Sequence, residues 1–441
     1  MKTKYILPAI FMMLISTAWA QTRQSDWWAH FDDPVLDTLI YMGQNNNLDL
    51  AQAIKRVEMA RQAVREAKSG YYPQISLGVG WDRARTSGYT TRATGSSMTQ
   101  SYFSVGANLS WEIDLFGRIT VKVKEQKGAY RASAEDYTWM CVTIAAEIAD
   151  YYMQLRTLQQ ELIVTREHIE SQEKVLKITE ARKDAGLASM MDVAQAKTTF
   201  YSTQASLCNL ETEVATTINA IAVLTGTYPQ EMQGMLSAPA PQPNAEWTLD
   251  TDVSPELLRN RPDVREAEYE VEEYAAALGV EKKQWLPSLA LTASVGTEAW
   301  RLGDLFKKES FTYAVAPQLS WTVFDGFARN AEIASAREQL MASVDNYNLT
   351  LLTAVQEVEN AIVTYAQAVK YEQEIGVVLQ NAQLYYTLAL DRYKQGLDAF
   401  INVSDAQITL LQYANELVTA RGSVLSAIIA LQKTLCLGIT D

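Results

Sequence analysis

The sequence LSWEIDLFGR at residues 109–118 returns in related form as LSWTVFDGFAR at residues 319–329. Two further pairs flank it: YYPQISL at residues 71–77 matches WLPSLAL at 285–291, and AGL at 185–187 matches QGL at 395–397. The offset between the copies stays between 210 and 214 residues. Because strand, turn and helix signals keep one order in both copies, we infer that the chain is an internal duplication.

Four segments beside these motifs alternate apolar and polar residues. They begin after Pro73, at Phe103, after Pro287 and at Phe311, and the last continues to Val323. A period of two predicts a strand with one apolar and one polar face, and about ten residues let a tilted strand cross a bilayer. The polar faces carry small residues, which suit a water-filled lumen, and aromatic residues lie near the strand ends. The alternative, a soluble sandwich, fits poorly with the long segments between the strands.

The number of strands has a consequence for assembly. Four strands cannot close a barrel, and open strand edges are not tolerated in lipid. Bacterial barrels have about eight strands or more. If these strands span a membrane, several chains must pool them, so the sequence predicts an oligomer.

Two long segments without proline, residues 121–185 and 330–395, carry apolar residues in heptad spacing, and a further heptad pattern ends at Leu431. Sustained heptads predict coiled-coil packing, and helices of this length reach roughly 100 Å at about 1.5 Å per residue. Gly186 and Gly396 are expected to end these helices in the left-handed conformation and to reverse the chain. A fibrous coiled coil is the alternative, but it does not explain the strands of membrane length.

The first twenty residues have the pattern of a secretory signal peptide. Lys2 and Lys4 precede an apolar run at residues 6–15, and AWA at residues 18–20 predicts cleavage before Gln21. This run is too short to form a membrane-anchoring helix, because a span needs about 20 apolar residues. We therefore expect an exported chain, with no later segment apolar enough to form a transmembrane helix.

The composition restricts the chemistry. A formal charge of −14 argues against nucleic acid as a partner, because neutralising phosphates requires clustered Lys and Arg. His30 and His168 are the only histidines, and the three cysteines show no metal-ligand spacing. The sequence contains no Gly-rich phosphate loop, G-x-S-x-G or H-E-x-x-H motif. We expect no catalytic residue, no cofactor and no enzymatic activity.

Four motifs, taken together with the duplication, are specific to one family. They are WEIDLFGR at residues 111–118, RPDVREAE at 261–268, FDG at 324–326, and YKQG at 393–396 leading to VSDAQ at 403–407. The chain resembles the TolC-like outer membrane factors of bacterial efflux and secretion systems, and among them the members that serve resistance-nodulation-division pumps. Many of those members carry a lipidated N-terminal cysteine, which does not follow the predicted cleavage site here. Membrane anchoring would then rest on the barrel alone.

The resemblance implies an α+β membrane protein. It implies a homotrimer with a twelve-stranded β-barrel, four strands per chain, continued by a long α-helical coiled-coil tunnel in the periplasm. It places the barrel in outer membrane lipid and an equatorial belt at residues 27–67 and 227–262. The expected division is a signal peptide at residues 1–20, a first repeat at 21–226, a Pro-rich equatorial linker at 227–254 and a second repeat at 255–441.

The function that this resemblance implies is that of a passive conduit in a tripartite efflux system. Small molecules would leave an inner membrane pump through a periplasmic adaptor (membrane fusion) protein and then through this channel. One alternative is a type I secretion channel for proteins or peptides with the same architecture. The third hypothesis is an enzyme or a structural filament. Catalytic activity, or failure of the protein to fractionate with the outer membrane, would favour this hypothesis.

The resemblance places a periplasmic gate at Ile401 and Asp405. These residues are four apart, so they share one face of a helix. In a trimer they would form an apolar ring that resists hydration and a carboxylate ring that attracts cations and offers a site for a divalent cation. The alternative is that Ile401 is a heptad core residue and that Asp405 is solvated.

The tips of the helical hairpins are expected to dock the adaptor, because they end the tunnel. Asp192 and Asn402 occupy equivalent places after the two tip glycines and are expected to hydrogen-bond neighbouring hairpins. The full set of tip residues is Gly186, Leu187, Asp192, Gly396, Leu397 and Asn402.

The acidic balance also predicts ion selectivity. Removing Lys2 and Lys4 changes the formal charge from −14 to −16, and Asp82, Glu112 and Glu298 lie on the polar strand faces. We expect the pathway to favour cations. The alternative is that most of the acidic residues are solvated on the exterior of the tunnel.

Overall fold

The computed structural model describes residues 23–24, 27–87, 89, 98–243, 258–436 and 439–440. The predicted signal peptide at residues 1–20 and residues 244–254 of the predicted linker lie outside this range. The chain forms two units: unit 1 contains the described parts of residues 1–52, 138–261 and 352–441, and unit 2 those of residues 53–137 and 262–351. Helices α2 (Leu48–Ser69), α3 (Arg118–Asp184) and α8 (Ala328–Lys394) contribute residues to both units.

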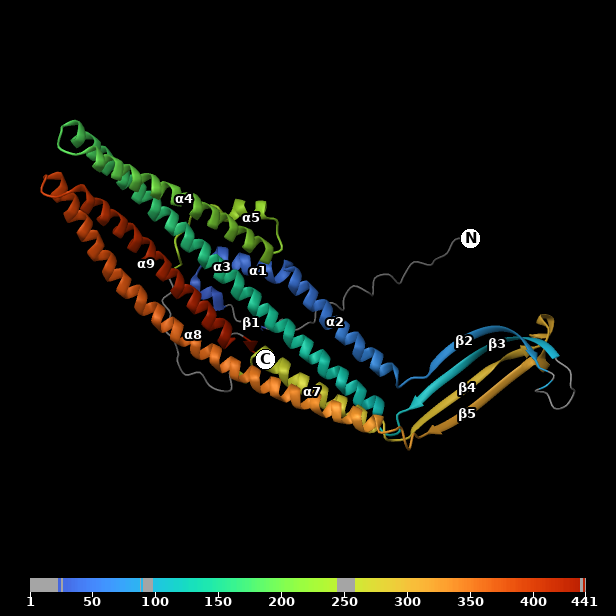
Figure 1. The fold of residues 1–441 in the computed structure, drawn as a ribbon. Coiled ribbons are helices and arrows are strands. Elements are labelled where there is room, and N and C mark those ends of the chain that lie inside the picture. Colours follow the sequence, from blue (N-terminus) through green and yellow to red (C-terminus); the bar gives the residue numbers. More distant parts are fainter. Residues whose placement is uncertain are drawn as a thin grey trace, which may run out of the picture. The chain divides into compact units, whose positions relative to one another are not determined.

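Unit 2 contains a four-stranded antiparallel sheet, which includes all four predicted strands (Figure 1). The strands are β2 (Gln74–Thr86), β3 (Met98–Ile113), β4 (Ser288–Ala299) and β5 (Phe311–Ser320), paired in that order. Strands β3 and β4 come from different repeats and pair with Gly106 opposite Gly296. Strands β2 and β5 form the two edges of this sheet, and each pairs with one neighbour.

The register of the sheet separates an apolar face from a polar one. Leu77, Ala107, Val295 and Tyr313 lie opposite one another across the four strands. The next row, which faces the other side because strand residues alternate, is Gly78, Gly106, Gly296 and Thr312. Leu77, Val295 and Tyr313 are exposed in the single chain. The predicted alternation is therefore present, with its large apolar side chains uncovered.

The strands lead into helices through two matching turns. The indole Nε1 of Trp111 donates to the Tyr71 carbonyl at 3.0 Å, and that of Trp321 donates to the Trp285 carbonyl at 3.0 Å. Strand β5 ends one residue before Trp321, so the predicted continuation to Val323 is wrong. The reason is that Ser320 pairs with Ser288, the first residue of β4, and Pro287 before it has no N–H to donate, so β5 has no further strand partner.

An aspartate caps the helix after each turn. The Asp114 carboxylate accepts from the backbone N–H groups of Ile119 and Thr120, both at 2.9 Å, at the start of α3. The Asp325 carboxylate accepts from the N–H of Arg329 at 3.2 Å at the start of α8. Such side chains satisfy helix donors that have no intrahelical partner. The repeated aspartate in the two sequence motifs thus has the same structural role twice.

Unit 2 also contains α7 (Pro262–Lys283), and the β4–β5 connection contains two short 3-10 helices, η2 (Leu302–Asp304) and η3 (Lys308–Ser310). Unit 1 contains α1 (Pro34–Asn46), α4 (Met190–Leu224), α5 (Pro229–Leu236) and α9 (Phe400–Leu435) with parts of α3 and α8. The short helix η1 (Trp27–Phe31) precedes α1, and β1 (Arg23–Gln24) pairs with β6 (Ile439–Thr440).

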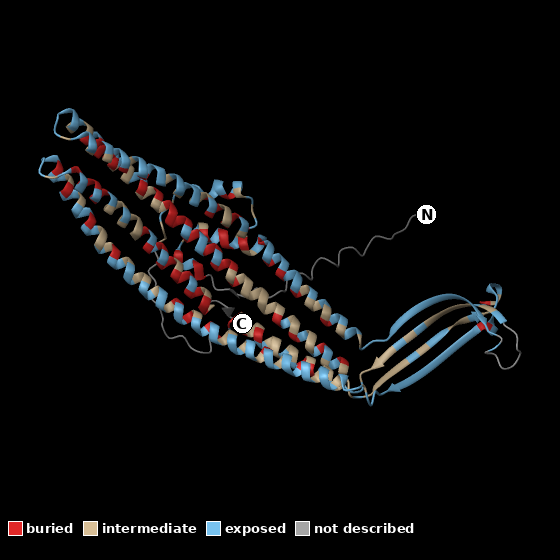
Figure 2. Cartoon of the chain, in the orientation of Figure 1, coloured by how far each residue is buried: buried red, intermediate tan, exposed pale blue. Residues whose placement is uncertain are grey.

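The core of unit 1 lies between its helices, as the buried positions in Figure 2 show. The predicted heptad positions Ala420, Val424, Ala427 and Leu431 of α9 are all buried. Pairs of helices are joined at Gly186, with φ of +73°, and at Gly396, with φ of +76°. The predicted left-handed glycines are confirmed. Other large side chains buried in this core include Leu36, Leu39, Ile40, Ile148, Tyr152, Met153, Leu155, Ile218 and Ile221.

The first part of the Pro-rich linker is fixed to unit 1 by side chains. Gln159 Nε2 donates to the Leu236 carbonyl at 2.7 Å. Gln242 Nε2 lies 2.9 Å from Thr157 Oγ1 and 3.0 Å from the Val418 carbonyl oxygen. The carbonyl at the end of α5 and the residues that follow this helix have no helix or strand partner, and these contacts satisfy them and hold the segment against α3 and α9.

One described helix, α9, is long and apolar enough by length and composition to cross a membrane, and half of its most apolar window is buried inside the protein. The expectation that no later segment passes this test is therefore wrong. The buried heptad positions give the physical reason, because a core helix has the same composition as a membrane span.

Candidate functional site

The two hairpin tips have closely similar backbones. At the first tip the Leu187 N–H donates to the Arg182 carbonyl at 2.8 Å, and at the second the Leu397 N–H donates to the Arg392 carbonyl at 2.9 Å. The glycine before each leucine has positive φ, so both helices end in the motif that satisfies their last carbonyls. Leu187 and Leu397 are largely exposed. The tips thus present apolar side chains on rigid turns.

Asp192 and Asn402 make hydrogen bonds within their own tips. Ser189 and Asp192 form a capping box, in which the Ser189 N–H donates to Asp192 Oδ2 at 2.9 Å. Asn402 Nδ2 donates to Asp398 Oδ1 at 2.6 Å, and the same oxygen accepts from the Ala399 N–H at 2.9 Å. These contacts order the first turns of α4 and α9. The predicted hydrogen bonds to neighbouring hairpins stay a prediction.

The proposed gate residues lie on one uncovered face of α9. Ile401 is 59% exposed, and Asp405 is exposed as well. On the opposite face Val403 and Ala406 are fully buried against the other helices of the tip. Within the described chain, therefore, Ile401 is not a core residue, and the first two turns of α9 present an apolar and an acidic side chain together.

A tyrosine on α8 contacts the acidic gate residue. Tyr385 donates its hydroxyl to Asp405 Oδ2 at 3.3 Å. Desolvation and the nearby Asp405 carboxylate raise the pKa of Tyr385, so the hydroxyl remains a donor. The position of Asp405 is thus set partly by α8 and not by α9 alone.

Three polar contacts join the two hairpins beneath this face. Arg182 Nη1 donates to the Lys394 carbonyl at 2.9 Å, and its guanidinium lies 4.8 Å from the centre of the Tyr393 ring. The hydroxyls of Ser171 and Tyr386 lie 3.1 Å apart, and those of Thr199 and Ser404 lie 3.0 Å apart. Together with the buried cluster around Phe400 and Val403, they make the tip a single packed four-helix body.

Sequence reasoning missed Arg182, Tyr385 and Asp398 at this site. The duplication held a usable signal, because Arg182 and Arg392 occupy equivalent positions 210 residues apart. Arg392 binds Asp398 through Nε at 3.3 Å, whereas Arg182 binds the neighbouring hairpin. Equivalent residues with different partners show that the two tips have diverged.

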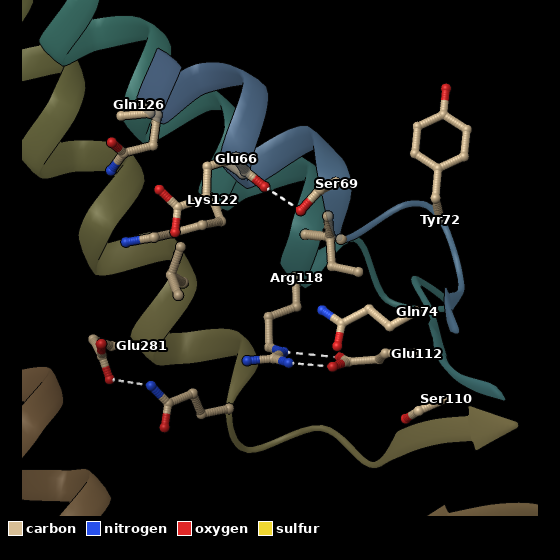
Figure 3. A pocket seen from close by; sticks show the side chains of 16 residues that line it. Glu66, Ser69, Tyr72, Gln74, Ser110, Glu112, Arg118, Lys122, Gln126 and Glu281 are labelled. Carbon is tan, nitrogen blue, oxygen red and sulfur yellow. Dashed lines mark hydrogen bonds and ion pairs between the residues drawn. The ribbon is translucent and has the colours of Figure 1, made fainter. Parts of the chain in front are cut away.

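The polar face of the sheet is the second candidate surface, and it belongs to unit 2. A groove of about 800 Å³ lies where this face meets α2, α3 and α7, and it is lined by polar side chains (Figure 3). Arg118 binds the Glu112 carboxylate in this groove through Nε at 3.1 Å and Nη2 at 2.5 Å. The predicted contribution of Glu112 to cation selectivity is thus reduced by a paired cation. Asp82 and Glu298 are exposed on the same face.

Among the described residues, no group of three or more His, Cys, Asp or Glu side chains is arranged to hold a metal ion. A carboxylate ring at Asp405 requires several chains, so the predicted divalent cation there stays a prediction.

Comparison with known proteins gives one family match. The family model described as "Outer membrane efflux protein" matches residues 39–227 and 253–436. The toluene efflux pump outer membrane protein TtgF of Pseudomonas putida is 30% identical over 422 residues, covering 94% of this chain and 86% of that protein. The solvent efflux pump outer membrane protein SrpC of Pseudomonas putida is 29% identical, covering 92% of this chain and 86% of that protein.

Solved structures of similar fold are outer membrane proteins. The outer-membrane channel OprN matches with a TM-score of 0.88 and 27% identity, covering 93% of this chain and 92% of that chain. The outer membrane protein VceC of Vibrio cholerae matches with a TM-score of 0.85 and covers 94% of this chain and 99% of that chain. At 23% identity, the second match speaks for the fold alone.

Proposed function

Because this chain belongs to the outer membrane efflux protein family, we propose that it forms, as a homotrimer, the passive outer membrane conduit of a tripartite pump. The protein is an efflux component of the outer membrane. In the proposed assembly, three chains pool their strands into a twelve-stranded barrel, and the helical hairpins form a periplasmic tunnel. The conduit itself does no chemistry, and an inner membrane pump supplies the energy.

The observation that carries this proposal is the uncovered sheet. Its two edge strands, β2 and β5, each lack a second neighbour in the described chain, and their apolar side chains are exposed. In lipid every backbone N–H and C=O must be paired within the protein, so such edges require further strands. Copies of this chain supply them if β2 of one pairs with β5 of the next.

The proposed partners follow from the tips. Exposed Leu187, Leu397, Met190 and Met191 offer apolar contacts on rigid helix ends, which suits docking of a periplasmic adaptor. The pump behind it is proposed to be of the resistance-nodulation-division type. TtgF and SrpC are named for toluene and solvent efflux, and this supports small-molecule cargo over the secretion of proteins.

The proposed division of the chain is unchanged: a signal peptide at residues 1–20, repeats at 21–226 and 255–441, and an equatorial linker between them. The family match in two segments, residues 39–227 and 253–436, supports the two repeats. The matching turns at Trp111 and Trp321 support them independently.

The assembly is tested by measuring the mass of the purified protein in detergent. We expect about three times the 49.3 kDa of the full chain, less the signal peptides. Reconstitution into planar bilayers should then give discrete conductance steps. A stable monomer that conducts would contradict the proposal, because it would need a closed barrel from one chain.

The gate is tested by conductance of the double variant Ile401→Ala/Asp405→Ala. If both side chains form rings at the narrowest point, their removal should raise single-channel conductance severalfold and abolish block by divalent cations. The matched control is Met191→Ala/Gln195→Ala, which alters the equivalent positions of the first hairpin. Equal conductance of the gate variant, the control and the wild type, all as trimers, would place the constriction elsewhere.

A further inference from the structure

The connection between β4 and β5, residues 300–310, is ordered but exposes large apolar side chains; we call it the outer loop. Leu305 is only 3% exposed, and Ser310 Oγ donates to the Asp304 carbonyl at 2.7 Å. The Lys307 N–H donates to the same carbonyl at 3.0 Å. These contacts fix two short 3-10 turns. The backbone conformation of these turns then directs the remaining side chains outward.

Three large apolar residues of the outer loop point away from this small core. Trp300 is 62% exposed, Leu302 is 63% exposed and Phe306 is 82% exposed. Phe311 and Tyr313, near the start of strand β5, are exposed as well, and their rings lie 6.2 Å apart. Several large apolar side chains exposed on one ordered loop and the adjoining strand end mark an interaction site, because leaving them in water is unfavourable.

The net charge of the outer loop is opposite in sign to that of the whole chain. The loop carries Arg301, Lys307 and Lys308 against Asp304 and Glu309, a net charge of +1, whereas the chain carries −14. Lys307 is paired with Asp304 at 2.5 Å. Arg301 and Lys308 are both exposed and flank the apolar residues.

The position of the loop identifies what covers it. Within unit 2, β4 begins just after α7 and β5 ends just before α8, so the outer loop joins the strand ends that lie away from these helices. If the strands cross the outer membrane as proposed above, the loop lies at the outer leaflet. Aromatic and apolar side chains with adjacent cations are the combination that binds a lipid interface with anionic headgroups.

We propose that the outer loop is a lipid-binding site that inserts Trp300, Leu302 and Phe306 into the outer leaflet and binds the phosphate groups of its glycolipid through Arg301 and Lys308. This proposal rests on the proposed function for its orientation. It assigns the loop a second interaction, separate from conduction.

The proposal is tested by binding of bisphosphorylated lipid A to the full-length trimer in zwitterionic detergent. We expect Arg301→Gln/Lys308→Gln to weaken binding about thirtyfold, because each basic residue near an anionic membrane surface contributes about fivefold. Leu302→Ser/Phe306→Ser should weaken it as well. Lys282→Gln, at an exposed lysine of α7, and Met59→Ser, at an exposed methionine of α2, are the matched controls and should bind as wild type.

Two further arms separate the competing occupants. The monophosphorylated lipid should bind more weakly than the bisphosphorylated one, and millimolar inorganic phosphate should not displace the lipid. Equal lipid binding by all variants, or full displacement by free phosphate, would overturn the proposal. Loss of the trimer in the loop variants would instead make the loop a contact between chains. Mass and conductance of the wild type, measured on the same samples, report failure of the proposed function separately.

Discussion

Arg261 shows how much one buried side chain supports unit 1. It is 1% exposed, its Nη2 lies 2.7 Å from Glu357 Oε2, and its Nη1 donates to the Thr434 carbonyl at 3.2 Å. The guanidinium also lies 5.2 Å from the centre of the Trp139 ring. One residue, which lies directly before α7, thus connects the middle of α8 with the end of α9.

Replacing Arg261 should therefore destabilise the protein. The Thr434 carbonyl would lose its buried partner, which costs about 1–3 kcal/mol, whereas the Glu357 side chain is 43% exposed and can be hydrated. We expect Arg261→Ala to lower the urea midpoint of helix unfolding, measured by circular dichroism. Arg259→Ala, at an exposed position two residues earlier, should leave the midpoint in place. Similar midpoints for both variants would show that the contacts of Arg261 are not stabilising.

The residue scale also shows where sequence reasoning stops. Ile401 and Asp405 could be placed on one helix face from their spacing, and Gly186 and Gly396 could be identified as helix ends from residue type. The contacts of Tyr385 with Asp405 and of Arg182 with the Lys394 carbonyl could not, because they depend on how separate helices pack. The pairing of Arg118 with Glu112 was missed for a different reason, because it depends on the conformation of the turn between β3 and α3.

At the scale of elements, α7 and α3 share an acidic seam. Burial makes the largest contribution to raising the pKa of Glu266 to about 7, and the rest comes from nearby carboxylates, in the order Asp136, Glu270, Asp263 and Glu135. Arg265 balances Glu135 at 3.3 Å, and Arg56 balances Asp136 at 3.3 Å. The folded chain thus holds a proton on Glu266 that the unfolded chain releases at lower pH.

The sign of the resulting pH dependence follows directly. Between the ordinary glutamate pKa of 4.5 and about 7, the folded state binds more protons than the unfolded state, so stability falls as pH rises through this window. Glu266→Gln removes the titrating group and should flatten the dependence of the melting temperature on pH. Glu268→Gln, on the exposed side of the same helix, serves as the control. An unchanged pH profile in Glu266→Gln would assign the effect to other groups.

The sheet depends on two glycines where β3 and β4 approach each other. A Cβ atom on Gly296 would lie 2.5 Å from the Val105 carbonyl oxygen, and one on Gly106 would lie 3.0 Å from the Val295 carbonyl oxygen. Because backbone atoms cannot move aside as a side chain can, the strands would have to separate. Gly78, in the same row, has no atom within 4 Å of such a Cβ.

We therefore expect Gly106→Ala and Gly296→Ala to lower the yield of assembled protein from membranes, with Gly296→Ala the more severe. Gly78→Ala should give wild-type yield. The fraction that resists unfolding in mild detergent on a semi-native gel is the measurement. Equal yields for all three variants would mean that the sheet tolerates a wider strand spacing at this row.

At the scale of the whole molecule, the alternation of strands, the heptads and the duplication were readable from sequence, because each is a periodic property of the chain. The ends of the elements were less predictable: β5 stops at Ser320 because its partner β4 begins at Ser288, directly after Pro287. The composition of α9 likewise did not distinguish a core helix from a membrane span, because both bury apolar faces.

The net negative charge of the chain should also affect the ion selectivity of the channel. We expect reversal potentials in a salt gradient to show cation preference, and Asp82→Asn/Glu298→Gln to reduce it, because both residues are exposed on the polar strand face. Glu309→Gln is the control, because it changes the charge by one in the outer loop, outside that face, and it should leave the cation preference unchanged. An anion preference in the wild type would refute the prediction.

The open edges β2 and β5 also govern how the protein must be made. A newly exported chain presents two open strand edges that carry exposed apolar residues, and such edges template pairing with any other strand they meet. Folding of the sheet is therefore coupled to association of the chains. Biogenesis should depend steeply on the local concentration of chains, and overproduction should lead to aggregates before it leads to more channels.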